Sequence, residues 1–212
     1  MPRHRRLLKN ELLPQRLAEV QAARPGQRIE LWFQDEARFG QQGCNSRCWA
    51  PRGSRPRAVR QTDYEWLYLF GAVCPASGRS NGWIMPRADT YTMQLHLDSL
   101  SRSLQPEVHA LLVLDGAGWH GSKALRVPDN LTLLKLPPYA PELNPAEAMW
   151  RELRQRHLSN RAWADIAALD AALGTAWLCL SNDTGRLQRL TSFHWINAAL
   201  ARCSTATAPD TS

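Results

Sequence analysis

Residues 110–118 read ALLVLDGAG. The first five of these residues are apolar, which is typical of a strand that is covered on both faces of a sheet. The run ends at Asp115, and the glycines that follow allow the backbone to turn sharply. We therefore expect a buried strand over 110–114. It would place Asp115 at a carboxyl end, where α/β sheets gather their functional groups.

Strands and helices are expected on both sides of this segment. An alternating run, RIELWF over 28–33, predicts an earlier strand with Asp35 just past its end. Other strands are expected over 65–74, 82–85 and 131–136, and helices over 5–23, 90–104, from 145 onward, over 162–180 and over 187–200. This order predicts an α/β fold with a mixed sheet and helices on its faces.

Composition limits the class of protein. The chain has 212 residues, of which 44% are apolar, enough to bury one core. Its longest apolar run, 66–74, is shorter than the roughly 20 residues that span a bilayer, and no secretory segment follows the N-terminus, so we expect no membrane partner. Five scattered cysteines favour a reducing cytoplasm over a disulfide framework. Cys44 and Cys48 have no second pair at zinc-ligand spacing.

The charge is strongly basic, with a net value of +7 and a pI of about 9.6. Five arginines fall within residues 47–60, which contain no acid but do contain proline and glycine, so this run is expected to be a loop or ragged hairpin. Arginine binds phosphate oxygens in pairs, which favours a nucleic-acid backbone over an ordinary basic surface. The expected contacts from this loop are Arg47, Arg52, Arg55 and Arg57.

Three acids are placed where phosphodiester chemistry would need them. Asp35 and Asp115 follow strands, and Glu147 lies in the first turn of the helix that Asn144 and Pro145 are expected to start. Hard divalent cations take such oxygen ligands. Each acid also has an ordinary interpretation as a loop, capping or helix-dipole residue. Glu142 competes with Glu147 for the third position, but the helix start favours Glu147.

Four segments together resemble a known family. They are LDGAGWHGS (114–122), LPPYAPELNPAE (136–147), WFQDEARFG (32–40) and RCWAPRGSRP (47–56). In this order they are similar to the catalytic domain of DDE transposases, specifically the mariner-like superfamily and its bacterial insertion-sequence-630 branch. The resemblance covers roughly residues 28–160.

This resemblance implies a ribonuclease-H-like fold, with Asp35, Asp115 and Glu147 as the catalytic residues and metal ligands. The 31 residues between Asp115 and Glu147 are similar to the family's spacing. It also implies two Mg²⁺ or Mn²⁺ ions, cleavage at transposon ends, and transfer of the freed 3′-hydroxyl to a TA dinucleotide in target DNA. The partners expected are double-stranded DNA and a second copy of the chain in a homodimer.

The resemblance also suggests a division of the chain. Residues 1–27 are expected to be linker helices of the kind that follow helix-turn-helix modules, 28–200 the catalytic domain, and 201–212 a disordered tail. We expect no helix-turn-helix module within residues 1–212, which could reflect a truncated element, a downstream reading frame completed by frameshifting, or a fragment.

Further DNA contacts are expected around the acids. Trp119 could stack on an unpaired base or belong to the core, and His120 could touch the scissile phosphate or cap a helix. Lys123, Arg151 and Arg154 could contact phosphates or form a solvated basic face. Two other functions remain open: a ribonuclease-H-like nuclease without strand transfer, and a non-catalytic DNA-binding remnant.

Overall fold

A computed structural model describes residues 6–47, 49–54, 57, 61–116, 124–137 and 140–205. Its centre is a five-stranded sheet of order β3-β2-β1-β4-β5. The strands are β1 (Arg28–Gly40), β2 (Trp66–Val73), β3 (Ser80–Met85), β4 (Val108–Leu114) and β5 (Leu131–Lys135). The pairs β1–β2 and β2–β3 are antiparallel, whereas β1–β4 and β4–β5 are parallel. The predicted mixed sheet is confirmed.

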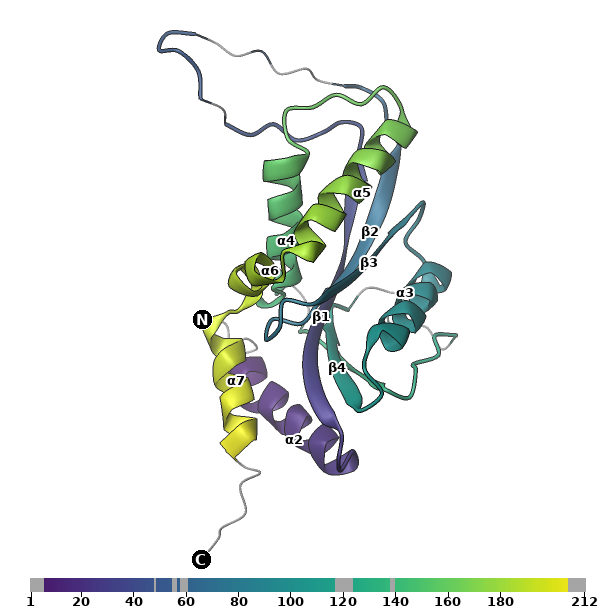
Figure 1. Ribbon diagram of the computed structural model, residues 1–212, viewed down its shortest axis with the longest axis vertical. Coiled ribbons are helices and arrows are strands. Elements are labelled where there is room, and N and C mark those ends of the chain that lie inside the picture. Colours follow the sequence, from purple (N-terminus) through teal and green to yellow (C-terminus); the bar gives the residue numbers. More distant parts are fainter. Residues whose placement is uncertain are drawn as a thin grey trace, which may run out of the picture.

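Helices cover both faces of this sheet (Figure 1). They are η1 (Leu8–Leu12), α2 (Leu13–Ala23), α3 (Thr90–Ser103), η3 (Pro141–Leu143), α4 (Ala146–Glu152), η4 (Leu153–His157), α5 (Ile166–Asn182), α6 (Thr184–Thr191) and α7 (His194–Thr205). α3 packs on one face through Met93, Leu97 and Leu100. The opposite face is covered by α2, α4, α5, α6 and α7. None of the helices in the described ranges is long and apolar enough to cross a membrane.

β1 is longer than predicted, which changes the place of Asp35. The sequence suggested a strand that ends at Phe33, but β1 continues to Gly40 and contains Asp35. Its second half stays ordered because it pairs with β2, from Gln34 opposite Ala72 to Gly40 opposite Trp66. Its parallel pairing with β4 stops at Phe33. Asp35 is therefore inside β1, just beyond the point where the parallel neighbour ends.

The C-terminal helices also differ from the prediction. α5 starts at Ile166 rather than at 162, because the side chain of Asp165 accepts a hydrogen bond from the backbone N–H of Ala168 at 2.7 Å. The single helix expected over 187–200 is two helices, since Ser192 leaves the helical conformation. α7 continues to Thr205, so the first residues of the predicted tail are helical.

Two tryptophans pack against glycines that face each other across β2 and β3. Gly71 and Gly82 are paired in register. A Cβ added at Gly71 would lie 2.5 Å from Cη2 of Trp150, and one at Gly82 would lie 2.4 Å from Cζ2 of Trp177. Because real Cβ atoms essentially never approach so closely, glycine at these positions lets the rings of Trp150 and Trp177 pack where they do.

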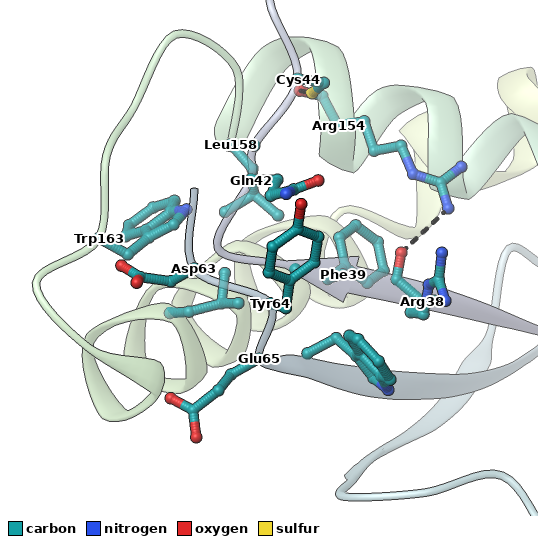
Figure 2. A pocket seen from close by; sticks show the side chains of 14 residues that line it. Arg38, Phe39, Gln42, Cys44, Asp63, Tyr64, Glu65, Arg154, Leu158 and Trp163 are labelled. Carbon is teal, nitrogen blue, oxygen red and sulfur yellow. Dashed lines mark hydrogen bonds between the residues drawn. The ribbon is translucent and has the colours of Figure 1, made fainter. Parts of the chain in front are cut away.

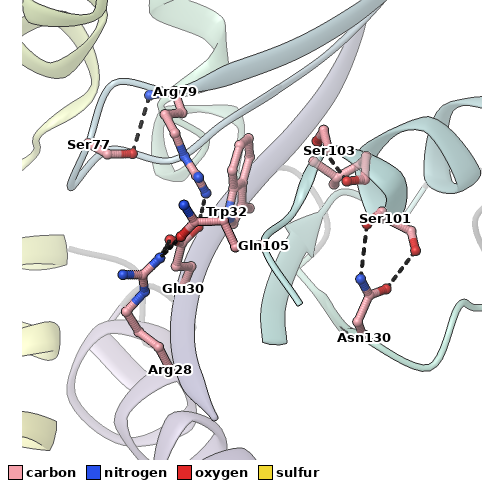
Figure 3. A network of polar contacts seen from close by, with 10 residues as sticks. Arg28, Glu30, Trp32, Ser77, Arg79, Ser101, Ser103, Gln105 and Asn130 are labelled. Carbon is pink, nitrogen blue, oxygen red and sulfur yellow. Dashed lines mark hydrogen bonds and ion pairs between the residues drawn. The ribbon is translucent and has the colours of Figure 1, made fainter. Parts of the chain in front are cut away.

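The amino end of β1 is held by a polar network (Figure 3). The carboxylate of Glu30 pairs with Arg79 and, at 3.3 Å, with Arg28, and it accepts a hydrogen bond from the indole of Trp32 at 3.0 Å. Arg28 also donates to Gln105 at 2.6 Å. These contacts fix β1 to the turn before β3 and to the loop before β4, at the end of the strand opposite the site.

Candidate active site

Asp35 lies on β1, and Asp115 directly follows β4, the parallel neighbour of β1. Phe33 of β1 pairs with Val113 of β4, so two residues further along each chain stand Asp35 and Asp115. Side chains two residues apart share a face, and Phe33 and Val113 both belong to the core under α4. The two aspartates therefore lie on the α4 side of the sheet, with Asp115 directly after the end of β4.

Glu147 approaches from the first turn of α4. The start of this helix is tied to β1 by Asn144, which is buried. Its Nδ2 donates to the carbonyl of Gln34 at 2.9 Å, while its Oδ1 accepts from the N–H of Ala146 at 3.1 Å. The N-cap of α4 is Pro145 and not Asn144 as predicted, because α4 begins one residue later, at Ala146; the side chain of Asn144 still accepts from the first N–H of the helix. The same side chain ties the start of α4, whose first turn carries Glu147, to the residue that precedes Asp35.

Trp150 is a site residue that the sequence did not reveal. Its indole Nε1–H donates to Oδ2 of Asp35 at 2.8 Å, and both side chains are buried. The one available signal was its position three residues after Glu147, which places both on one side of α4. Because tryptophans in helices usually serve the core, that spacing does not single it out.

Other acids lie near the carboxylate of Asp35 and act on its pKa. Burial raises the pKa of Asp35 to about 7 from the ordinary 3.8, against the lowering effect of the Trp150 hydrogen bond. The negative charges of Glu147, Glu36 and Asp115 raise it further. Such repulsion requires that the carboxylates lie near one another. A cation among them would remove both the repulsion and part of the desolvation cost.

The donor set fits a hard divalent cation in its chemistry. Asp35, Asp115 and Glu147 offer only carboxylate oxygens, the ligands preferred by Mg²⁺ and Mn²⁺. Within the described ranges, however, no three acidic, histidine or cysteine side chains form a group that could already hold a metal ion. Glu147 is exposed, whereas Asp35 is buried. The arrangement is therefore an open acidic site in which the exposed side chain can adjust to a cation.

Three of the predicted DNA-contacting arginines come together beside α4. Arg47, Arg151 and Arg154 line an open groove of about 670 Å³, together with Cys44, Asn45, Ser46 and Gln155. No residue in this lining is acidic. Arg151 and Arg154 follow Glu147 by four and seven residues, so they continue the helix face on which Glu147 lies. Arg52 and Arg57 do not line this groove, and Arg55, Trp119, His120 and Lys123 fall outside the described residues.

The arginine-rich loop is rooted at one place on the domain. Asn160 accepts from the backbone N–H of Ser46 at 3.0 Å and donates to its carbonyl at 3.1 Å. At the other end of the loop, the side chain of Gln61 accepts from the N–H of Trp163 at 2.9 Å. Residues 49–54 of the loop extend away from the sheet (Figure 1), and Trp49 among them is fully exposed. Just before the loop, the thiol of Cys44 donates to the backbone carbonyl of Arg154 at 3.1 Å.

A separate pocket of about 380 Å³ lies at the far end of β1 (Figure 2). Arg154 reaches across it, stacking over the ring of Phe39 at 5.1 Å and donating to the carbonyl of Arg38 at 3.4 Å. Arg38 in turn stacks over Trp66 at 5.0 Å. None of the three candidate ligands lines this pocket. Its contacts hold Arg154 in place at the boundary between the pocket and the arginine groove.

Comparison with known proteins shows the family to which the chain belongs. Residues 30–170, about two thirds of the chain, match the family described as DDE superfamily endonuclease. The chain belongs to this family. Over 130 residues it is 42% identical to "Uncharacterized protein y4pE/y4sA" of Sinorhizobium fredii (strain NBRC 101917 / NGR234), a match that covers 61% of this chain and 96% of the relative.

The fold of this DDE superfamily member is similar to that of solved transposase structures. The Mos1 transposase paired-end complex with left transposon end superposes with a TM-score of 0.59 at 16% identity, covering 97% of this chain and 63% of that chain. The mariner Mos1 paired end complex with Mg gives a TM-score of 0.56 at 15% identity, and the match covers 93% of this chain and 62% of that chain. The chain thus spans less than two thirds of these proteins. The predicted ribonuclease-H-like fold is confirmed.

Proposed function

We propose that this chain is the catalytic domain of a DDE transposase of the mariner-like superfamily, in its insertion-sequence-630 branch. It would cut DNA at transposon ends and join the freed 3′-hydroxyl to target DNA. The observation that carries the proposal is the convergence of Asp35, Asp115 and Glu147 on one face of the sheet, close enough to raise the pKa of Asp35. The fold shared with the Mos1 complexes supports it.

The three acids would hold two Mg²⁺ or Mn²⁺ ions. When bound, these ions supply the Lewis acidity that activates an attacking hydroxyl and stabilises the leaving oxygen. Asp35 contributes a fixed carboxylate, since β1 and Trp150 hold it from two sides. Glu147 contributes an adjustable one from an exposed helix turn. No serine, tyrosine or cysteine nucleophile is required, because the attacking hydroxyl belongs to water or to DNA.

A joining assay tests the proposed function. Pre-cut DNA with a free 3′-hydroxyl is incubated with the full chain, Mg²⁺ or Mn²⁺, and a supercoiled target plasmid. Products joined at TA dinucleotides are the expected result, and they should disappear in Asp115→Ala. Nicking without joining would instead identify a ribonuclease-H-like nuclease. Neither product with either metal would identify a non-catalytic DNA-binding remnant.

The arginine groove would bind the phosphate backbone of the DNA. It continues the face of α4 that begins at Glu147, and its lining contains Arg47, Arg151 and Arg154 without an acid. Each phosphate contact releases counterions, so the logarithm of the affinity falls with the logarithm of salt concentration. The groove therefore predicts how the salt dependence of DNA binding should change when its arginines are removed.

Arg47→Gln and Arg151→Gln should each reduce the magnitude of that slope by about 0.9 for duplex DNA. The measurement is fluorescence anisotropy of a labelled duplex across a salt series in EDTA, where no cleavage occurs. Arg102→Gln is the matched control, because Arg102 is exposed in the last turn of α3 on the opposite face of the sheet. Unchanged slopes in both groove variants, or an equal change in the control, would contradict the assignment.

A further inference from the structure

The hydrogen bond between Trp150 and Asp35 joins two elements that are distant in sequence. The indole Nε1 of Trp150 on α4 lies 2.8 Å from Oδ2 of Asp35 on β1, and both side chains are buried. Filling the core would require only an apolar ring at this position. The N–H is instead directed at a carboxylate, which cannot donate a hydrogen bond when ionised and so accepts this one at full strength.

The sheet provides the space that this contact needs. Gly71 on β2 stands opposite Asp35 in register. A Cβ at Gly71 would lie 2.5, 3.3 and 3.4 Å from Cη2, Cζ2 and Cζ3 of Trp150. The ring therefore lies on the bare backbone of the strand next to Asp35. Any larger residue at Gly71 would push the indole away from the carboxylate.

Trp177 offers a natural comparison within the same fold. It lies over Gly82, the residue paired with Gly71, and a Cβ there would lie 2.4 Å from Cζ2 and 2.9 Å from Nε1 of Trp177. Both tryptophans are buried in the same core. Among the described contacts, however, the indole of Trp177 makes no hydrogen bond to a carboxylate. Trp177 thus shares the packing role of Trp150 without the polar contact.

We propose that Trp150 is a positioning residue that holds the carboxylate of Asp35 in the orientation needed to bind a divalent cation. This inference rests on the proposed function. A carboxylate has two oxygens, so a hydrogen bond that fixes Oδ2 would leave Oδ1 available to a cation. The partners that orient metal ligands typically change metal affinity by about 10- to 100-fold when removed. Gly71 contributes to this positioning, because its lack of a side chain leaves room for the indole ring of Trp150.

The test measures binding of Mn²⁺ to the full chain by electron paramagnetic resonance of the free ion, without DNA. Trp150→Phe keeps an aromatic ring and removes the N–H, and it should weaken Mn²⁺ binding about 10- to 100-fold. Trp177→Phe is the matched control and should leave the affinity unchanged. Gly71→Ala should reproduce the loss by displacing the indole, whereas Gly82→Ala should destabilise the fold without weakening Mn²⁺ binding.

A metal-free readout keeps the inference separate from the proposed function. Unfolding in EDTA of the wild type, Trp150→Phe, Asp35→Ala and the double variant gives the coupling between the two side chains. A hydrogen bond to a carboxylate should appear as a coupling of about 10- to 100-fold in the folding equilibrium constant. The same double-mutant cycle with Trp177→Phe in place of Trp150→Phe should give no coupling to Asp35→Ala.

The outcomes distinguish the proposed function of the chain from the positioning role of Trp150. Wild-type protein that binds no Mn²⁺, or binds it equally well after Asp115→Ala, would overturn the proposed function, and the unfolding cycle would still decide whether Trp150 holds Asp35. Mn²⁺ binding that is lost in Asp115→Ala but kept in Trp150→Phe would overturn the positioning role alone. Equal weakening in Trp150→Phe and Trp177→Phe would reduce Trp150 to a packing residue and also overturn it.

Discussion

Asp35→Asn is expected to make the metal-free protein more stable above neutral pH while it abolishes cleavage. Burial and neighbouring acids raise the pKa of Asp35 to about 7 in the folded chain, whereas an aspartate in an unfolded chain has a pKa of about 3.9. Between these values the folded state keeps a proton that the unfolded state has released. Stability therefore falls as pH rises through this window, and the loss is complete above about pH 7.

The size of this loss is about 4 kcal/mol, from about three pKa units at 1.36 kcal/mol each. Asparagine keeps an oxygen for the indole of Trp150 and removes the charge, but its buried amide costs about 1–3 kcal/mol if unpaired. The net gain at pH 8 should be about 1–3 kcal/mol. At pH 4 the gain should vanish or reverse, since Asp35 is then protonated in the folded wild type.

Urea unfolding in EDTA at pH 4, 6 and 8 measures this effect. Asp170→Asn, at an exposed position on α5, is the control for loss of one negative charge. Adding Mn²⁺ at pH 8 should stabilise the wild type and not Asp35→Asn, because a cation relieves the same repulsion. If the free energies of unfolding of the wild type and of Asp35→Asn differ by the same amount at every pH, the pKa of Asp35 is not raised in the folded chain.

The position of Asp115 could be predicted because a local pattern determines it, whereas Asp35 was expected just past a strand end and lies inside β1. An apolar run such as ALLVL fixes a buried strand, and the residue after it must emerge at the edge of the sheet. The antiparallel half of β1 was missed, since residues 34–40 include charged and polar side chains and are held by pairing with β2. Pairing partners along a sheet cannot be read from one strand's pattern.

The supporting residues of the site could not be predicted for a related reason. Trp150, Asn144 and Gly71 act through contacts that span from 79 to 115 positions in the chain: the packing of Gly71 against Trp150 and the hydrogen bonds to Asp35 and to the carbonyl of Gln34. In the sequence they are an ordinary helix tryptophan, a helix cap and a strand glycine. Only the register of β1 with β2 and the packing of α4 give them their roles.

Glu147→Gln is expected to reduce DNA cleavage by about 10³-fold or more, which corresponds to about 4 kcal/mol of transition-state stabilisation. The substitution keeps the shape of the side chain and removes the charge of the third ligand. Glu142→Gln, five residues earlier in η3, should retain nearly full activity. The difference follows from the anchoring of α4, because Asn144 ties the turn that carries Glu147 to the residue before Asp35.

Initial rates of nicking with saturating Mn²⁺ measure both variants, and duplex binding in EDTA shows whether each remains folded and competent to bind DNA. The structure already bears on the choice between the two glutamates. Of the acidic charges that raise the pKa of Asp35, that of Glu147 has the largest effect. If the loss of activity occurs instead in Glu142→Gln, the chain after β5 must rearrange when metal and DNA bind. In that case the anchor at Asn144 would be released in the active state, and Asn144→Ala should then leave cleavage intact.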